Sequence, residues 1–567
     1  MVDLILSNPA TGPASLFTRN FRVHSGIPIG LYSGGPRAPV ALIYGNISEN
    51  KLEEYSKQYS AIVAIPSMDN DEIPDVPFHY ETMTVKAPIL ATMQEIEREG
   101  FTRFVKTFEG GTLVLKGYTE SVLTLLFAAD LVKSTIRILS GELENNTGKD
   151  SYGRPKPPPE SVTYEPAVSF HFNLIENAIR YVYAQISEPL LSIPRWPDSA
   201  PFAVFLSHDV DVVRKWTKKR AAYELMLGLR DLLKFKGGKI AETISSIWDA
   251  TKGRDPYWQF DELLFMENGS GFKTTWFFAP FGGIYNNRDN TFDPVYHRSP
   301  AEITSMIRRI IEQGGELALH GTRGSFLDGK VLKKQLESFE SRLGFKLFGV
   351  RHHYLMFRHG KTLESSAEIG MQYDSTLGFS DRSGFRNGMA SPFFPFPSDH
   401  PAGAMVEIPL NFMDTVFVHD NDNPESVMKK VTETYLYAKA ARGMFSSLVH
   451  PENMDSSEIP GLKAFYRSLL TRFRTEGACS MTGAELLQWW RARESVLKKI
   501  EFGTNAWRIK DVFVPENMNV IITAPDIRSM RFSIEGLTCA SKLDRETLTI
   551  SPGGVDPEKG ITITRTS

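Results

Sequence analysis

Short apolar segments alternate with amphipathic segments through the middle of the chain, from about residue 200 to residue 495. Apolar runs of four to eight residues between turn signals are typical of buried strands, and apolar residues three and four positions apart are typical of helices. Helical spacing is found at 299–315 and 332–344. Strands are predicted at 202–207, 273–280, 316–320, 347–351, 371–375, 404–410 and 444–450. This alternation predicts an α/β fold with a parallel sheet closed into a (β/α) barrel.

The region before the barrel has its own pattern. Segments 40–47 and 60–66 are predicted strands, while 89–101 and 120–139 have apolar residues at helical spacing. We therefore predict an N-terminal α/β domain of unknown role over residues 1–145.

Two changes of composition set the remaining boundaries. Residues 146–164 contain four prolines and no apolar period, which is typical of a linker. The barrel is then assigned to residues 165–500. In residues 503–567, short apolar segments are separated by Asp, Pro and Gly turns, which predicts a small β-sandwich-like domain at the C-terminus.

Composition narrows the classes of function. The 567 residues have a net charge of −3, which gives no reason to expect nucleic acid or an anionic membrane as a partner. Cys479 and Cys539 lack the spacing of a zinc knuckle and are expected to be reduced thiols. The N-terminus has no basic segment before an apolar run, and no apolar run of transmembrane length follows. A cytoplasmic protein without a transmembrane segment is expected, and protein partners stay unknown.

Five predicted barrel strands end in side chains that ionise or bind metal. Carboxylates and imidazoles are costly to bury without partners, and catalytic groups of such barrels lie at the C-terminal ends of the strands. A site at this edge of the sheet is therefore expected, although a helix-capping aspartate or a hydrogen-bonded core histidine would explain each residue alone. The side chains concerned are His208, Asp209, Asp211, His320, Arg351, His352, His353, Asp374 and His450.

In this region the sequence resembles the polysaccharide deacetylases, carbohydrate esterase family 4. FLSHDVD (205–211) is similar to the family's first motif and ELALHGT (316–322) to the start of its second. GVRHHYL (349–355) is similar to its arginine motif and SLVHPE (447–452) to its final motif. The run at 373–396 resembles an uncharacterised bacterial subgroup that carries an extra N-terminal domain. The resemblance implies the irregular (β/α) barrel of this family.

The resemblance also implies a reaction, the hydrolysis of an acetamide on a carbohydrate substrate. One divalent metal ion, expected to be zinc, would activate water and polarise the carbonyl group. By motif position, Asp209 would be the general base, and Asp211 and His320 would hold the metal. Arg351 would orient the base, and His450 would protonate the leaving amine. Asp374 would orient His450 or Arg351, with a looser match to the family.

The sequence departs from the family at the third metal ligand. The second motif normally has a second histidine where this chain has Gly324. In the arginine motif, His353 stands where the family has proline, so we predict Asp211, His320 and His353 as the metal ligands. Neighbouring side chains at a strand end point in opposite directions, so only one histidine of the 352–353 pair can face the site. His208 and His352 remain alternative ligands.

Two other classes of function fit the same residues. The first is a non-catalytic glycan-binding protein that has lost the metal together with the second-motif histidine. In such a protein no third ligand would lie near Asp211 and His320. The second is a scaffold for polysaccharide biosynthesis, in which the terminal domains serve for docking.

Two further features have structural expectations. The loop 384–396 is expected to be a lid that shapes the substrate site. One of Trp489 and Trp490 is expected to be half exposed.

Overall fold

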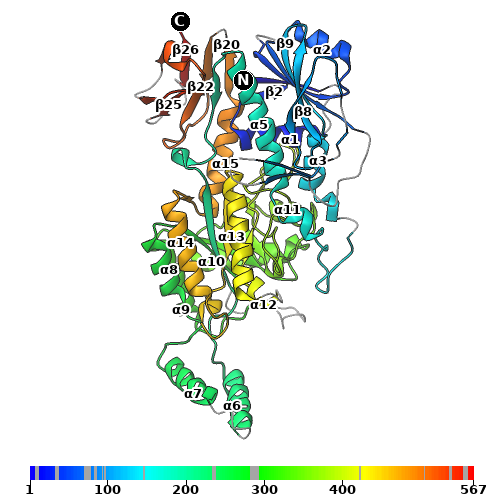
Figure 1. The fold of residues 1–567 in the computed structure, drawn as a ribbon. Coiled ribbons are helices and arrows are strands. Elements are labelled where there is room, and N and C mark those ends of the chain that lie inside the picture. Colours follow the sequence, from blue (N-terminus) through cyan, green and yellow to red (C-terminus); the bar gives the residue numbers. More distant parts are fainter. Residues whose placement is uncertain are drawn as a thin grey trace.

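The computed structural model joins the seven strands predicted in the middle region into one parallel sheet (Figure 1). The structure describes residues 1–566 with the exception of 7–11, 32–36, 69–77, 82–85, 92, 95–96, 145–146, 233–237, 281–292, 420–422, 504, 536–538 and 553–559.

This sheet has the strand order β16-β15-β14-β13-β12-β11-β18-β17, and β19 pairs with β11 beside it. Every pairing is parallel, which confirms the predicted barrel-type α/β fold. In the described residues the sheet is curled, and its end strands β16 and β17 are not paired with each other. The strands are β11 Ala203–Val210, β12 Thr274–Phe278, β13 Glu316–Gly321, β14 Gly349–His352, β15 Tyr373–Asp374, β16 Val406–Glu407, β17 Phe412–Met413, β18 Met444–Leu448 and β19 Cys479–Ser480.

Helices connect successive strands of the sheet and bury their apolar sides against it. Two begin with a capping box: Ser299 and Glu302 cap one helix, and Thr482 and Glu485 cap another, so the polar side chains satisfy backbone N–H groups that would otherwise lack partners. The helices are α8 Phe260–Gly269, α9 Pro300–Glu312, α10 Gly329–Leu343, α11 Lys361–Glu368, α12 Val416–His419, α13 Pro424–Ala440, α14 Leu462–Thr475 and α15 Gly483–Lys498.

A second sheet forms the N-terminal domain, with the order β2-β1-β3-β4-β9-β8-β7. Its first five strands are parallel, and β8 and β7 continue it antiparallel. Helix α5 packs against this sheet and against α1 and α3. The elements are β1 Val2–Leu6, α1 Gly12–Ser25, β2 Ile29–Leu31, β3 Val40–Gly45, α2 Glu49–Ser56, β4 Ala61–Pro66, β5 Phe78–Glu81, β6 Lys86–Ile89, β7 Thr102–Lys106, β8 Thr112–Thr119, β9 Val122–Phe127, α3 Leu131–Leu139 and α5 Ala167–Gln185.

Two helices predicted in this domain are wrong in whole or in part. The described residues of 89–101 contain the end of β6 and no helix, and the segment 120–139 is strand β9 followed by the shorter helix α3. In the second case the apolar residues of VLTLLF are nearly continuous, and five of the six residues are buried, so their spacing cannot distinguish a buried strand from a helix.

The C-terminal region forms two four-stranded antiparallel sheets, as its pattern predicted. Their orders are β10-β22-β25-β24 and β20-β21-β26-β23, and their buried residues share one apolar core. Strand β10 precedes the barrel in the sequence, so this domain takes one strand from the connection between α5 and β11. The strands are β10 Leu190–Ser192, β20 Ile500–Gly503, β21 Ala506–Ile509, β22 Val520–Thr523, β23 Phe532–Glu535, β24 Cys539–Leu543, β25 Thr547–Pro552 and β26 Ile561–Arg565.

A buried ion pair fixes the chain to the barrel just before the segment predicted as a linker. Glu144 accepts two hydrogen bonds from Arg386, of 2.8 and 2.9 Å, and a third contact of 2.8 Å from His359. Burial would raise the pKa of the Glu144 carboxyl, but Arg386 and His359 outweigh it and lower this pKa to about 2. The chain leaving the N-terminal domain is thereby fixed to the barrel.

The loop 384–396 is not a lid, contrary to the sequence-based expectation. It is buried, with Asn387 donating to Leu139 O and the Ala390 N–H donating to Ser169 Oγ, so it fills the space between the barrel and the N-terminal domain. Trp489 and Trp490 are both buried, which corrects the expectation of one half-exposed ring. Cys479 is a free thiol, and the Cys539 side chain lies outside the described residues.

Replacing Glu144 by glutamine is expected to destabilise the protein by about 3 kcal/mol at neutral pH, because Arg386 would be left buried without its counter-charge. The folded-state pKa of Glu144 lies below its unfolded value, so the stabilisation is present above about pH 4.5 and is lost as pH falls toward about 2. Denaturant unfolding of both proteins across this pH range measures the difference.

The matched control is Glu142→Gln, because Glu142 makes a partly exposed ion pair with Arg137 in the same segment. Its effect should stay below about 0.5 kcal/mol. An equal decrease in the free energy of unfolding in the two variants would contradict the assigned role of Glu144.

Candidate functional site

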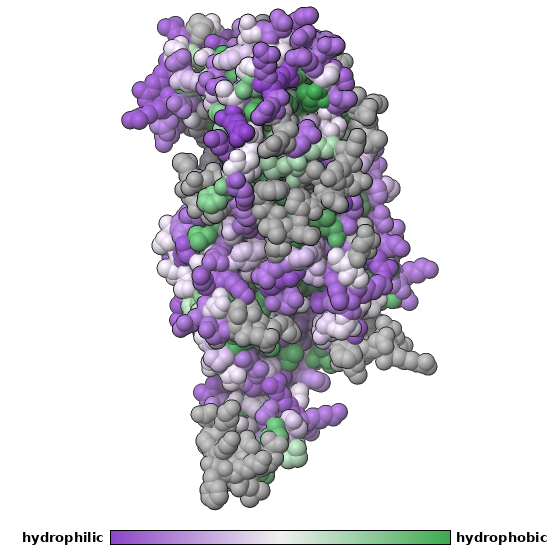
Figure 2. All heavy atoms as spheres, turned by 45° about the vertical axis from the view of Figure 1, so that its right-hand side comes forward, coloured by the Kyte–Doolittle hydropathy of each residue, from purple (hydrophilic) through white to green (hydrophobic). Residues whose placement is uncertain are grey.

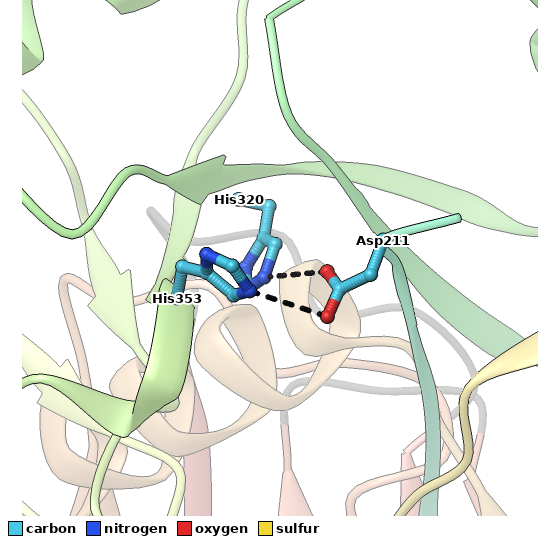
Figure 3. A group of neighbouring side chains, drawn as sticks. All are labelled: Asp211, His320 and His353. Atoms are coloured by element: carbon cyan, nitrogen blue, oxygen red, sulfur yellow. Dashed lines mark ion pairs between the residues drawn. The ribbon is translucent and has the colours of Figure 1, made fainter. Parts of the chain in front are cut away.

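Three side chains predicted as metal ligands meet at the C-terminal edge of the barrel sheet (Figure 3). Asp211 directly follows β11, His320 lies in β13, and His353 begins the short 3-10 helix η3 (His353–Leu355) after β14. One carboxylate oxygen and one nitrogen from each histidine all lie within 4.8 Å of one another. The structure therefore brings together the predicted trio, with His353 as its third member.

Hydrogen bonds to the second nitrogen of each imidazole aim both rings at the carboxylate. His320 Nε2 lies 3.2 Å from Asp211 Oδ1, and His353 Nε2 lies 3.3 Å from Asp211 Oδ2. On the far side of the rings, His320 Nδ1 is 2.9 Å from Arg351 O, and His353 Nδ1 is 3.2 Å from Asp293 Oδ1. A carbonyl or carboxylate in this position is the usual support of a metal-binding histidine, because it fixes the tautomer and the ring orientation.

The trio also passes a test of fit for a divalent ion. Asp211 Oδ1 and His320 Nε2 are buried and lie 3.2 Å apart, but neither atom makes a hydrogen bond of good geometry, which is costly unless another group satisfies them. One carboxylate and two imidazoles are the donors that zinc and related ions accept, with a further position left for water or substrate. Asp211, His320 and His353 therefore fit such an ion.

The charges around the trio favour a cation between its members. Burial would raise the pKa of Asp211, but His353 and His320 lower it well below its usual range. Burial would lower the pKa of His353, but Asp211 and Asp293 raise it to about 9. Asp211 and Asp293 therefore stabilise a positive charge at His353. A bound ion would supply this charge in place of the proton on the imidazole.

A buried arginine holds the predicted base. Arg351 is fully buried in β14 and donates from NH1 to Asp209 Oδ1 at 2.9 Å and to Ser207 Oγ at 3.0 Å. Its Nε and NH2 donate to the backbone oxygen and hydroxyl of Ser375, both at 2.8 Å. The second Asp209 oxygen lies 3.8 Å from His320 Nε2, so the carboxylate faces the trio.

A buried imidazole approaches the trio from the opposite side. His450 follows β18 and lies with Nε2 3.6 Å from Asp211 Oδ2. Its Nδ1 is 2.7 Å from Asp414 Oδ1, and its backbone N–H donates to the other oxygen of Asp414. Burial would lower the pKa of His450, but Asp414 and Asp211 raise it well above its usual range, which favours the protonated imidazole.

Burial raises the pKa of Asp374 to about 6, against the charge of Arg351, so an orienting role toward Arg351 stays a prediction. The register partner of Asp374 in the sheet is Glu407, and its carboxylate accepts a hydrogen bond from the Thr376 N–H. It therefore points toward the neighbouring strand. The carboxylate that orients His450 is Asp414.

The two alternative ligands point away from the site. His208 lies 2.9 Å from Glu267 and 2.8 Å from the backbone oxygen of Val449. His352 lies 3.5 Å from the Ser366 hydroxyl, and burial lowers its pKa to about 3. Alternation along the chain thus separates His352 from His353, as expected for adjacent residues at a strand end.

Asp211 and His353 line a pocket of about 280 Å³ that the linker segment helps to enclose. Tyr152 stacks on Tyr354 with ring centroids 5.3 Å apart, and Arg154 NH1 donates to Tyr354 O at 2.6 Å. The lining residues are Tyr152, Arg154, Asp209, Asp211, His353, Tyr354, Leu355, Ser380, Asp381, Met413, Thr415 and His450.

Sequence reasoning missed the supporting residues Asp293 and Asp414 and the pocket residues Tyr152 and Arg154. Asp414 follows β17, a two-residue strand too short to predict, although the NFMD run at 411–414 is a polar strand end of the same kind. The other three lie in connecting segments, where no periodic signal marks them.

Replacing Asp211, His320 or His353 singly by alanine should abolish binding of a divalent ion, because two of three ligands rarely hold one. We expect about one equivalent of metal in the wild-type protein and less than about 0.1 in each variant, measured by mass spectrometry after dialysis. His352→Asn is the matched control and should keep its metal. A wild-type protein that takes up no metal after supplementation would contradict the assignment.

The chain matches no family model and no curated protein. Among solved structures it is similar to Agd3, titled a novel carbohydrate deacetylase, at 8% identity over 100% of this chain and 98% of the other, with a TM-score of 0.41. It is also similar to a putative polysaccharide deacetylase from Mycobacterium smegmatis, at 19% identity over 53% and 93% of the two chains and a TM-score of 0.35. For the peptidoglycan deacetylase PdaC from Bacillus subtilis, the identity is 12% over 42% and 87%, with a TM-score of 0.26. The solved structures that this chain resembles thus include polysaccharide deacetylases, all at low sequence identity.

Proposed function

We propose that the protein is a metal-dependent hydrolase that removes acetyl groups from N-acetylated carbohydrates. The observation that carries the proposal is the convergence of Asp211, His320 and His353, with buried ligand atoms that lack hydrogen bonds of good geometry, between a carboxylate held by Arg351 and an imidazole held by Asp414. Hydrolysis of an amide needs these groups, because water must lose a proton and the departing nitrogen must gain one.

The non-catalytic alternative predicted that no third ligand would lie near Asp211 and His320. His353 lies there, which favours the hydrolase.

The cytoplasmic location of the protein remains a prediction.

In the proposed mechanism, Asp211, His320 and His353 hold the ion. When bound, such an ion lowers the pKa of water toward about 7 and polarises the acetyl carbonyl group. Asp209 accepts the proton of the attacking water. Its ion pair with Arg351 fixes the direction of the carboxylate, so that the oxygen facing the trio is the one available as base.

His450 supplies the second proton. Asp414 holds Nδ1, so the Nε2–H points into the pocket toward the position of the leaving nitrogen. As the carbon–nitrogen bond breaks, this proton passes to the nitrogen, and acetate and a free amine are released. The proton on Asp209 then passes to His450, directly or by exchange with solvent, which restores both groups.

The pocket wall supports a carbohydrate as the substrate. Tyr152 and Tyr354 present stacked aromatic rings beside the catalytic residues, and aromatic faces pack well against the C–H faces of a sugar ring. The Arg154 guanidinium, which also interacts with Asp150 at 2.7 Å, keeps the Tyr152 segment against η3. Tyr152 would therefore bind the sugar without taking part in proton transfer.

Asp414→Asn is expected to lower kcat about a hundredfold with little change in KM, because His450 would lose the charge that keeps it protonated while the backbone contact could persist. Acetate release from N-acetylated oligosaccharides hydrolysed by the wild type measures the effect. Asp381→Asn makes the same change at the pocket rim and should retain kcat within about twofold. An unchanged kcat in Asp414→Asn would remove His450 from the mechanism.

Tyr152→Ala is expected to raise KM about tenfold and to change kcat by less than about twofold, because the aromatic face contributes to binding alone. Tyr152→Phe keeps the ring and should behave as the wild type in the same assay. If KM rises as much in the phenylalanine variant as in the alanine variant, the hydroxyl group binds the substrate, and stacking on the ring is contradicted.

A further inference from the structure

Two helices project from the barrel as a hairpin, outside the body of the molecule (Figure 1). They are α6 (Lys218–Leu232) and α7 (Gly238–Thr251), and they pack against each other. The hairpin follows Asp211 in the sequence, so it starts at the edge of the sheet that carries the candidate site.

The base of the hairpin is firmly attached to the barrel. Lys215 pairs with Asp455 and, at 3.0 Å, with Glu458, in the segment that follows His450. Arg220 donates to Tyr257 OH at 2.7 Å. The segments that follow β11 and β18, next to the predicted base Asp209 and the predicted acid His450, are thus tied together where the hairpin leaves the barrel.

The projecting helices expose large apolar side chains. On α6 these recur every third residue, and on α7 they are four residues apart, so each set follows one side of its helix. They are Tyr223, Met226 and Leu229 on α6 and Ile244 and Trp248 on α7, each 52% to 62% exposed. In Figure 2, hydrophobic atoms are visible on the surface of this projection beside hydrophilic ones. An apolar surface of this kind is unfavourable in water unless something covers it.

The charge of the same segment is positive, in contrast to the whole chain. Residues 218–252 contain eight Lys and Arg and four Asp and Glu, whereas the chain has a net charge of −3. Lys218 and Lys219 are exposed at the start of α6, and Lys252 Nζ lies 5.0 Å from the centre of the Trp248 ring. A tryptophan next to a lysine, with apolar residues on one side of a helix, is the composition of segments that lie in a membrane interface.

We infer that the α6–α7 hairpin binds the surface of a membrane that contains anionic lipids. The apolar side chains enter the boundary between headgroups and acyl chains, and the lysines contact lipid phosphates. The positive charge of the hairpin favours a membrane over a second copy of the chain as the partner. Two paired hairpins would bring like charges together, whereas anionic headgroups attract the lysines. In the described residues no helix is long and apolar enough to cross a membrane. The inference does not depend on the proposed hydrolase activity.

Vesicle co-sedimentation of the full chain tests the inference. The probes are vesicles of phosphatidylcholine alone and vesicles with about one third phosphatidylglycerol. We expect binding to the anionic vesicles that weakens as salt is raised, and little binding to phosphatidylcholine alone. The double variant Leu229→Glu, Trp248→Glu should reduce the partition coefficient about tenfold or more, and Lys218→Glu, Lys219→Glu should reduce it severalfold on anionic vesicles only.

The matched control is Phe265→Glu on α8, an apolar residue that is 80% exposed but lies outside the hairpin. It should bind vesicles as the wild type does, and thermal unfolding should be unchanged in all of these variants because the side chains are exposed. Absence of binding to anionic vesicles at low salt would overturn the inference, as would an equal loss in Phe265→Glu. If the wild-type protein is a dimer that does not bind vesicles, and the hairpin variants are monomers, the apolar surface would be assigned to contact with a second copy of the chain instead.

Discussion

One buried guanidinium organises the candidate site. Arg351 donates to Asp209 and Ser207 on β11 and to Ser375 after β15, while its own carbonyl oxygen accepts from His320 Nδ1. A buried arginine is costly unless all its donors are satisfied, and here the groups that satisfy it are those whose positions the proposed chemistry requires. The direction of the base and the orientation of one imidazole are therefore coupled through a single residue, so replacing Arg351 would disturb both.

The sequence predicted the strands of the barrel well, because each is a short apolar run that ends in polar residues, as at FLSHDVD. The same feature located Asp209, Asp211, His320 and His353, and alternation along β14 explains why His353 faces the site and His352 does not. The neighbour of Asp374 across the sheet, Glu407, could not be predicted, because it is known only once the register of β15 and β16 is known. Carboxylates contributed by loops carry no such pattern.

The parts of the chain assigned to separate domains interlock. The loop 384–396 fills the space beside α3 and α5, and β10 leaves the connection before the barrel to join the C-terminal sheet. Glu144 ties the chain to the barrel just before the predicted linker, and the linker carries Tyr152 into the pocket. Composition identified this segment as irregular, but its proline content says nothing about where it binds. Irregular backbone can be held as firmly as a helix when buried charges anchor it.

The net charge of the whole chain conceals an uneven distribution. A value near zero gave no reason to expect a charged partner, yet the positive segment 218–252 coincides with the apolar side chains of α6 and α7. Neither property alone would single out the hairpin, because scattered exposed apolar residues and local clusters of lysine are both common. Their coincidence on an element that projects from the edge carrying the candidate site, with its base fixed by Lys215 and Arg220, is what distinguishes it. A membrane bound by the hairpin would thus be linked, through the base of the hairpin, to the edge of the sheet that carries the candidate site.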